Sequence, residues 1–221
     1  MNQPRKIKRT FAFTLVEMLV VISVIAVLAA LLFPAFTAVK NKMTITKAKA
    51  ELKQMAMFID TYKSKKGYYP PDNNGVVNPT MTSLYYELSG VKNTPLGFQT
   101  FDGATTISVA VCSANFGRDG ILNCSKVTSE DGGQPATEFI KQLKPNQYAT
   151  LPSGVRVLTS SVNWPADRGD VIPGVTLVNP WRYVSSGPTN NHDSYDLWVD
   201  IVIRGKTNRI SNWSETPEIV P

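Results

Sequence analysis

The sequence predicts an α+β protein in which a long N-terminal transmembrane helix packs against a globular head with a C-terminal antiparallel β-sheet. Three observations predict this fold class. An uncharged apolar run covers residues 18–39, a helical stripe of apolar residues follows over 40–66, and residues 179–213 alternate between apolar and polar side chains. The predicted helix therefore covers residues 13–66, and the predicted head covers residues 67–221.

Composition and charge restrict the classes of function. Of the 221 residues, 43% are hydrophobic and 10% aromatic, which is enough for a folded core. The formal charge is +6, but four basic residues and no acid lie within residues 1–12. The rest of the chain carries 19 basic and 17 acidic residues, so nucleic-acid binding by the head is not expected. Two cysteines and one histidine argue against a zinc site with Cys and His ligands.

The apolar run predicts a membrane anchor over residues 13–39. From Met18 to Val39 there are 22 residues without a charge, which as a helix would extend about 33 Å and cross a bilayer. So long a run that is apolar all round argues against a buried core helix. A removable secretory signal would be shorter and would end in an A-x-A-like site, which residues 36–38 do not supply.

Glu17 interrupts the apolar pattern near the start of the anchor. An acidic residue inside a membrane costs roughly 2.5–3.5 kcal/mol on insertion scales, so it usually marks a function or a partner. The alternative is a shallow glutamate, four residues from Phe13, whose carboxylate reaches the lipid headgroups. The residues around Glu17 favour the first interpretation.

A short basic leader (residues 1–12) ends in Ala12 and is followed by FTLVEMLVVISVIAVLAALL. This order resembles the processing and assembly segment of type IV prepilins and type II secretion pseudopilins. The resemblance implies that prepilin peptidase cuts between Ala12 and Phe13 and N-methylates Phe13, which makes Glu17 the fifth mature residue. Pro34 stands where the family typically has a proline. Ala12 departs from the usual glycine before the cut, but alanine is the next smallest side chain, so we expect cleavage to survive at a lower rate.

The resemblance also implies a role for Glu17 in assembly. Its carboxylate would pair with the Phe13 amine of a neighbouring subunit, which offsets the cost of the acid only in the correct axial register. Glu17 would therefore set subunit register and would not act as a catalyst. Pro34 has no amide hydrogen and should kink or loosen the helix, which would help the stems to pack.

The second half of the predicted helix, residues 40–66, carries its apolar residues on one face. They follow one another at intervals of 3, 4, 3, 4 and 3 residues: Ile45, Ala48, Leu52, Met55, Ile59 and Tyr62. This face should pack against the head, and Gly67 is the expected C-cap. Residues 81–90 (MTSLYYELSG) then predict a short amphipathic helix packed on the sheet.

Residues 91–178 are rich in turn-forming residues and are interpreted as an insertion in the head. Within them we expect strands over 105–111 and 154–162 and a short helix over 138–145. The closing segments NPWRYVSSG, SYDLWVDIVIRG and RISNW, within residues 179–213, predict antiparallel strands. Their order of Asn-Pro-Trp, Tyr-Asp-Leu and Ile-x-Asn-Trp resembles the C-terminal sheet of the type II secretion major pseudopilin.

Few residues of the head suggest binding chemistry. The major pseudopilin family often binds calcium in an acidic loop after Tyr-Asp-Leu, but here Asp200 is the only carboxylate before Trp213, so that calcium site is not expected and no metal site is predicted. Asp102, Asp119 and Asp131 each precede a glycine and are interpreted as turn residues, with a calcium role as the alternative. His192 lies in a polar turn, and no motif supplies the nucleophile of a hydrolase. Cys112 and Cys124 enclose 11 residues and would form a disulfide in an exported head, with two unpaired thiols as the alternative.

These features predict a non-enzymatic subunit of a type II secretion pseudopilus, anchored once in the bacterial inner membrane with its head in the periplasm. The expected partners are prepilin peptidase, other pseudopilin subunits in a homo-oligomeric filament, an inner-membrane assembly platform and membrane lipid. No nucleic acid and no cofactor are expected. A type IV pilin-like subunit for adhesion, motility or DNA uptake is the alternative within the family. A membrane-anchored enzyme and an anchored binding module are the alternatives outside it.

Overall fold

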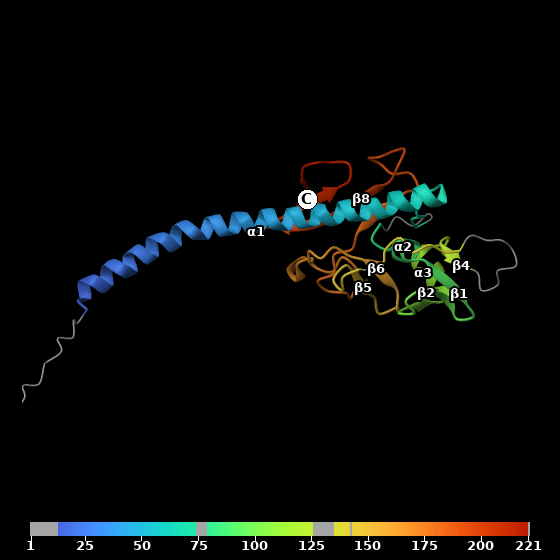
Figure 1. Cartoon of the computed structure of the whole chain (residues 1–221), viewed down its shortest axis with the longest axis horizontal. Coiled ribbons are helices and arrows are strands. Elements are labelled where there is room, and N and C mark those ends of the chain that lie inside the picture. The colour runs from blue at the N-terminus through green and yellow to red at the C-terminus, as the bar shows by residue number, and fades with distance from the viewer. Residues whose placement is uncertain (1–12, 74–78, 126–134, 142, 221) are drawn as a thin grey trace, which may run out of the picture. The chain divides into compact units, whose positions relative to one another are not determined.

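The computed structural model describes residues 13–73, 79–125, 135–141 and 143–220, and shows a long helix followed by a head of short strands and helices (Figure 1). The side chains of residues 31–35 are outside this description. The chain divides into two units, of which the first ends at Met43 and the second begins at Thr44. From here on the first unit is called the stem. The second unit, which includes the second half of the long helix as well as the strands, is called the head.

Helix α1 (Leu15–Lys66) has 52 residues and confirms the predicted long helix. It ends at the expected C-cap: Gly67 has φ of +86°, which glycine adopts without strain, and its N–H donates to the carbonyl oxygen of Lys63 at 2.8 Å. The helix continues through Pro34, whose side chain is not described, so the kink stays a prediction. Over the described part of the chain, no helix is long and apolar enough to cross a membrane.

The C-terminal sheet is antiparallel, as predicted. Its strands lie in the order β10–β9–β8–β7, with the bounds Arg182–Val184 (β7), Asp196–Ile203 (β8), Lys206–Ser211 (β9) and Glu218–Val220 (β10). In the register of the sheet, Trp198 of β8 lies opposite Arg182 of β7 and Ser211 of β9. The sheet is one strand wider than predicted, because β10 lies beyond residue 213 and pairs with β9.

The second half of α1 contributes one face to the core of the head, as its spacing predicts. Ala48, Met55, Ile59 and Tyr62 are fully buried, in one cluster with the inward-facing residues of β8. Two lysines that follow the apolar run also bind the head. Their ammonium groups donate to backbone carbonyl oxygens of other head segments, Lys47 to Ser161 at 3.2 Å and Lys49 to Glu215 at 2.5 Å.

The insertion contains two small sheets. The first has the strand order β3–β2–β1–β4, with the bounds Val91–Thr94 (β1), Gly97–Thr100 (β2), Thr106–Ile107 (β3) and Cys124–Ser125 (β4). The second is the antiparallel pair Tyr148–Thr150 (β5) and Arg156–Leu158 (β6), and the 3-10 helix η2 (Ala166–Arg168) follows it. In the first sheet, strands β1 and β4 pair in parallel.

Of the strand predicted over residues 154–162, only the part that forms β6 is confirmed.

The strand predicted over residues 105–111 is wrong beyond Ile107. The chain there enters helix α3 (Val109–Phe116) instead. Its first turn is capped by Ser108, whose hydroxyl oxygen accepts the N–H of Val111 at 3.2 Å, and its end is capped by Gly117 at φ of +63°. The two caps give hydrogen-bond partners to backbone groups at both ends of the helix. They therefore favour a helix here, although β-branched valines by themselves favour a strand.

Two further expectations need correction around helix α2 (Leu84–Ser89). This helix is not amphipathic, because its side chains from Leu84 to Leu88 are all buried. The helix predicted over residues 138–145 is absent from the described residues of that range, and Gln142 lies outside them. The N–H groups of Phe139 and Ile140 donate to the carbonyl oxygen of Leu88, at 2.8 and 3.2 Å, rather than to a helix of their own.

Candidate functional site

The first turn of α1 is closed by reciprocal hydrogen bonds between two side chains. The backbone N–H and the hydroxyl of Thr14 both donate to Oε2 of Glu17 at 2.8 Å, and the N–H of Glu17 donates to the Thr14 hydroxyl oxygen at 3.2 Å. This is a capping box, which satisfies N–H groups that the start of a helix leaves without partners. T-L-V-E at residues 14–17 is the sequence signature of a capping box, so this feature was predictable although it is not among the expectations above.

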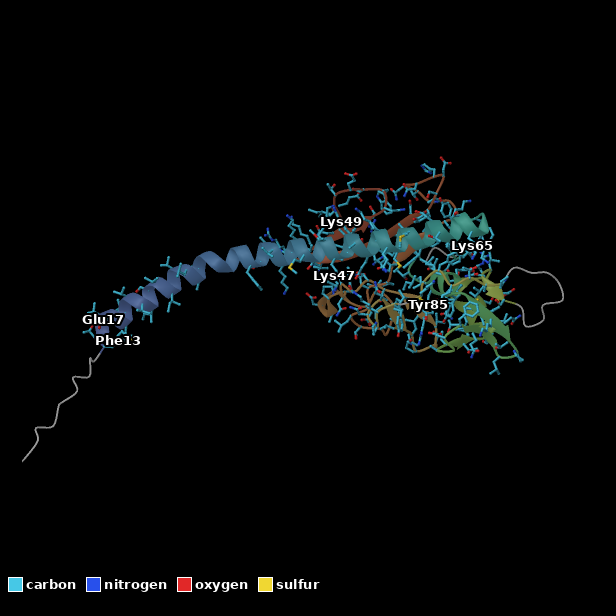
Figure 2. All side chains as sticks on the ribbon, in the orientation of Figure 1. Phe13, Glu17, Lys47, Lys49, Lys65 and Tyr85 are labelled. Atoms are coloured by element: carbon cyan, nitrogen blue, oxygen red, sulfur yellow. The ribbon has the colours of Figure 1, made fainter. Side chains whose placement is uncertain are left out.

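Phe13 and Glu17 lie together at the start of the stem (Figure 2). Phe13 is 73% exposed, and Oε1 of Glu17 accepts no hydrogen bond from the described residues. The Glu17 carboxylate also compensates the positive end of the helix dipole. The turn therefore fixes one carboxylate oxygen and leaves the other accessible to an ammonium group from outside. Ala12, on the other side of the predicted cleavage bond, lies outside the described residues.

The stem that follows this turn has no core of its own. Its large apolar side chains are 45–80% exposed and point to all sides of the helix: Leu15, Val16, Met18, Leu19, Val20, Val21, Ile22, Val24, Ile25, Val27 and Leu28. Soluble monomers rarely expose apolar patches of this extent. The described residues of the chain leave these side chains uncovered, and Glu17 is the only acid of the stem.

A second carboxylate, missed in the sequence, lies at the centre of the head. Glu87 on α2 is fully buried and accepts hydrogen bonds from the Tyr62 hydroxyl at 2.8 Å, the Leu122 N–H at 2.7 Å and the Asn123 N–H at 2.9 Å. Burial raises the pKa of Glu87, although these hydrogen bonds act in the opposite direction. The contacts join α1, α2 and the segment before β4, so the role of Glu87 is structural.

The two cysteines are free thiols. Cys112 is buried on α3, and burial raises the pKa of its thiol to about 11. Cys124 on β4 is half-buried, and burial followed by the charge of Glu87 raises its pKa. Neither thiol is therefore activated as a nucleophile. The disulfide between them stays a prediction.

The polar turn that carries His192 is ordered by Asp196. Its carboxylate accepts the N–H groups of Thr189, Asn190 and Asn191, each at 2.9 Å, and His192 itself is exposed. Among the residues described, no group of three or more His, Cys, Asp or Glu side chains could hold a metal ion. The expected absence of calcium stays a prediction, which a melting curve with and without a chelator would check.

Comparison with known proteins identifies the N-terminal site. Residues 7–33 match the family model described as the prokaryotic N-terminal methylation motif. The chain is also 34% identical over 64 residues to type II secretion system core protein G of Pseudomonas aeruginosa. That similarity covers 29% of this chain and 45% of the relative, so the chain spans less than half of the relative's length. No solved structure matches the chain significantly. The predicted resemblance is thus confirmed at the N-terminus, where residues 7–33 of this chain match the prokaryotic N-terminal methylation motif.

Proposed function

We propose that this chain is a structural subunit of a type II secretion pseudopilus, a periplasmic filament that promotes protein export. The observation that carries the proposal is the first turn of α1, where a fixed Glu17 begins an exposed apolar helix inside the N-terminal methylation motif. The similarity to core protein G supports a secretion system rather than an adhesive or DNA-uptake pilus. In this role the chain catalyses no reaction.

Processing comes first in the proposed sequence of events. Prepilin peptidase cuts between Ala12 and Phe13, removes the four basic residues of the leader, and N-methylates the new amine of Phe13. Residues 13–39 then anchor the chain in the inner membrane with the head in the periplasm. The uncharged run from Met18 to Val39 and the exposed apolar side chains of the stem support this anchor.

Assembly follows from the state of Glu17. In a bilayer an acid without a cationic partner costs roughly 2.5–3.5 kcal/mol. The capping box holds Oε2 against Thr14, so Oε1 is left for the Phe13 amine of the next subunit. That amine reaches Oε1 only at one axial offset between the two helices, so the pairing selects the register while the apolar stems pack around it. The assembly platform and the other pseudopilins of the secretion system are the proposed partners.

The test separates processing from assembly. Intact-mass measurement of the membrane-extracted chain, with and without prepilin peptidase, should show a product that begins at methylated Phe13. Ala12→Gly should accelerate this cleavage, because it restores the usual residue before the cut. Glu17→Gln keeps the size of the side chain and removes its charge, so the chain should be cleaved normally but filament yield should fall at least ten-fold in cells that carry the assembly machinery.

The matched control is Glu215→Gln, which removes an exposed acid from the head and should leave both cleavage and filament yield unchanged. A chain that still begins at Met1 in the presence of active peptidase would contradict the proposal. So would a Glu17→Gln chain that assembles as well as the original. Either result would favour an anchored binding module that forms no filament.

A further inference from the structure

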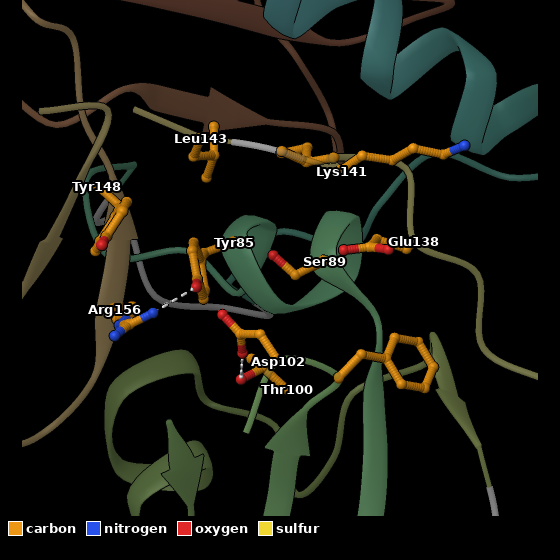
Figure 3. A pocket seen from close by; sticks show the side chains of 11 residues that line it. Tyr85, Ser89, Thr100, Asp102, Glu138, Lys141, Leu143, Tyr148 and Arg156 are labelled. Carbon is orange, nitrogen blue, oxygen red and sulfur yellow. Dashed lines mark hydrogen bonds between the residues drawn. The ribbon is translucent and has the colours of Figure 1, made fainter. Parts of the chain in front are cut away.

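The head contains a pocket that the proposed function does not use. It has a volume of about 360 Å³ and lies between α2, the end of β2, residues 138–148 and β6 (Figure 3). Most of its wall belongs to the insertion over residues 91–178. The volume is near the lower end of the range for small-molecule sites, which is about 300–1,000 Å³.

Arg156 on β6 is fixed at one side of the pocket. Its Nη1 donates to the Tyr85 hydroxyl at 2.9 Å, its Nε donates to the Thr150 hydroxyl at 3.3 Å, and its guanidinium lies 4.8 Å from the ring centroid of Tyr148. Its Nη2 donates to the carbonyl oxygen of Ala104 at 3.5 Å. A guanidinium has five N–H donors, so one N–H on each terminal nitrogen is left. The stacked, immobile group thus presents a fork of two donors.

Asp102 supplies a fixed acceptor beside this donor fork. Its Oδ1 accepts the Thr100 hydroxyl at 2.5 Å and the Ala104 N–H at 3.0 Å, while Oδ2 accepts no hydrogen bond from the described residues. Burial opposes ionisation of this carboxyl, but the two hydrogen bonds and the charge of Arg156 lower its pKa. Asp102 is therefore ionised at neutral pH, with one oxygen directed to the pocket.

Two further polar groups of the wall also lack partners among the described residues. In the view of Figure 3 the carboxylate of Glu138 lies beside Ser89, and the hydroxyl of Ser89 points to the side of Tyr85, whereas the ammonium of Lys141 points away from Arg156. Ile140 and Leu143 contribute apolar surface to the wall of the pocket. Over the whole wall, two carboxylates balance two cations.

We propose that this pocket binds a neutral sugar ring. Two adjacent hydroxyl groups of a sugar can each donate one hydrogen bond and accept another. They could donate to the carboxylate oxygen of Asp102 and accept from the two remaining N–H groups of Arg156. The apolar faces of the ring would contact Tyr148 and Leu143. Fixed groups of both signs line the pocket, so we expect simple ions to bind less well than a neutral ligand, since a cation would meet Arg156 and an anion would meet Asp102 and Glu138. This inference does not depend on the filament proposed above, so either can fail alone.

The test is saturation-transfer NMR on the full chain in deuterated detergent. The sugar probes are D-glucose, D-galactose and N-acetyl-D-glucosamine, and sodium acetate and ethylammonium chloride are the charged controls. We expect transfer to at least one sugar with a Kd on the order of 1 mM, and none to the controls. Glu138→Gln and Asp102→Asn should each weaken binding about ten-fold, because each replaces a charged acceptor by a neutral one. Asp119→Asn, an exposed acid outside the pocket, is the matched control and should bind normally.

Three results would overturn the proposal: no transfer to any of the three sugars, transfer to a charged control instead, or equal transfer in all variants. Asp102→Asn changes a residue that also orders its own turn, so its thermal unfolding is measured beside binding. Glu138→Gln keeps the test decisive in either case, since Glu138 is exposed and makes no hydrogen bond with the described residues.

Discussion

The two halves of α1 place the same kinds of side chain in opposite surroundings. In the stem, Ile22 and Ile25 are 62% and 58% exposed, whereas in the head Ile59 on the same helix is fully buried. Helix propensity does not explain this difference, because isoleucine is present in both halves. The head half is stabilised by the core that it contacts within the chain. The apolar side chains of the stem contact no such core, and their exposure is the physical basis of the proposed membrane and filament.

The largest expected effect comes from substituting isoleucine, the residue type present in both halves of α1. Ile59→Ala removes fully buried atoms from the core and should lower the free energy of unfolding of the head by about 2–5 kcal/mol. Ile25→Ala is the matched control in the stem, where the same atoms are exposed, and should leave the unfolding of the head unchanged. Denaturant unfolding of the full chain in detergent, followed by near-UV circular dichroism, measures both.

Equal effects of the two variants would contradict the division into stem and head, since Ile25 would then contribute to the same core. A negligible effect of Ile59→Ala would contradict the buried stripe itself. The stem substitution should instead act on filament yield, because the packing of stems is the proposed use of their apolar surface.

Two of the acidic residues on the helices, Glu17 on α1 and Glu87 on α2, sharpen the comparison. Glu17 is exposed at the first turn of the stem, whereas Glu87 is enclosed in the head, where burial raises its pKa above the ordinary value of 4.5. Between 4.5 and that raised pKa, the folded chain binds a proton that the unfolded chain has lost. The free energy of unfolding should therefore fall as pH rises through this window.

Glu87→Gln tests this expectation. The residue at position 87 can then no longer ionise, so the stability of the variant should depend less on pH as the pH rises from 4.5 through the raised pKa of Glu87. It should also be less stable by about 1–3 kcal/mol, because the amide nitrogen of Gln would face N–H groups of Leu122 or Asn123 that now donate to an oxygen. Denaturant unfolding across the pH range measures both effects, with Glu215→Gln as an exposed control. A slope that is unchanged in Glu87→Gln would assign the pH dependence to other groups.

The sequence was sufficient for the parts of the fold that repeat a simple pattern. The 3–4 spacing of Ala48, Met55, Ile59 and Tyr62 identified the buried face of α1, and alternation identified β8 and β9. The N-terminal site was also predictable, because Phe13, Glu17 and the basic leader lie within a short, ordered segment. All these features depend on residues that are close together in the chain, so the order and spacing of the residues are enough to predict them.

The remaining parts depend on contacts between distant segments. The valines of α3 favoured a strand, but the caps at Ser108 and Gly117 closed a helix that packs Cys112 and Phe116 into the core. Residues 138–145 have a helical composition, yet their first N–H groups are used by the end of α2. The enclosure of Glu87 could not be predicted either, since its donors lie 25 to 36 residues away. The capping box is different, because its signature lies within four consecutive residues, 14–17, and requires no distant contact.

The smallest expected effect concerns this capping box and tests whether the start of the stem is ordered before assembly. Thr14→Val keeps the shape of the side chain but removes the hydroxyl that bonds to Glu17 in both directions. Loss of a cap costs about 1 kcal/mol, so amide hydrogen exchange at residues 16–18 should accelerate about five-fold in the full chain. Thr61→Val is the matched control, because its hydroxyl donates only to the Met57 carbonyl oxygen within α1. Exchange that is unchanged in Thr14→Val would show that Glu17 is held by its backbone bond alone, and the register would then be set when the neighbouring amine arrives rather than in the free subunit.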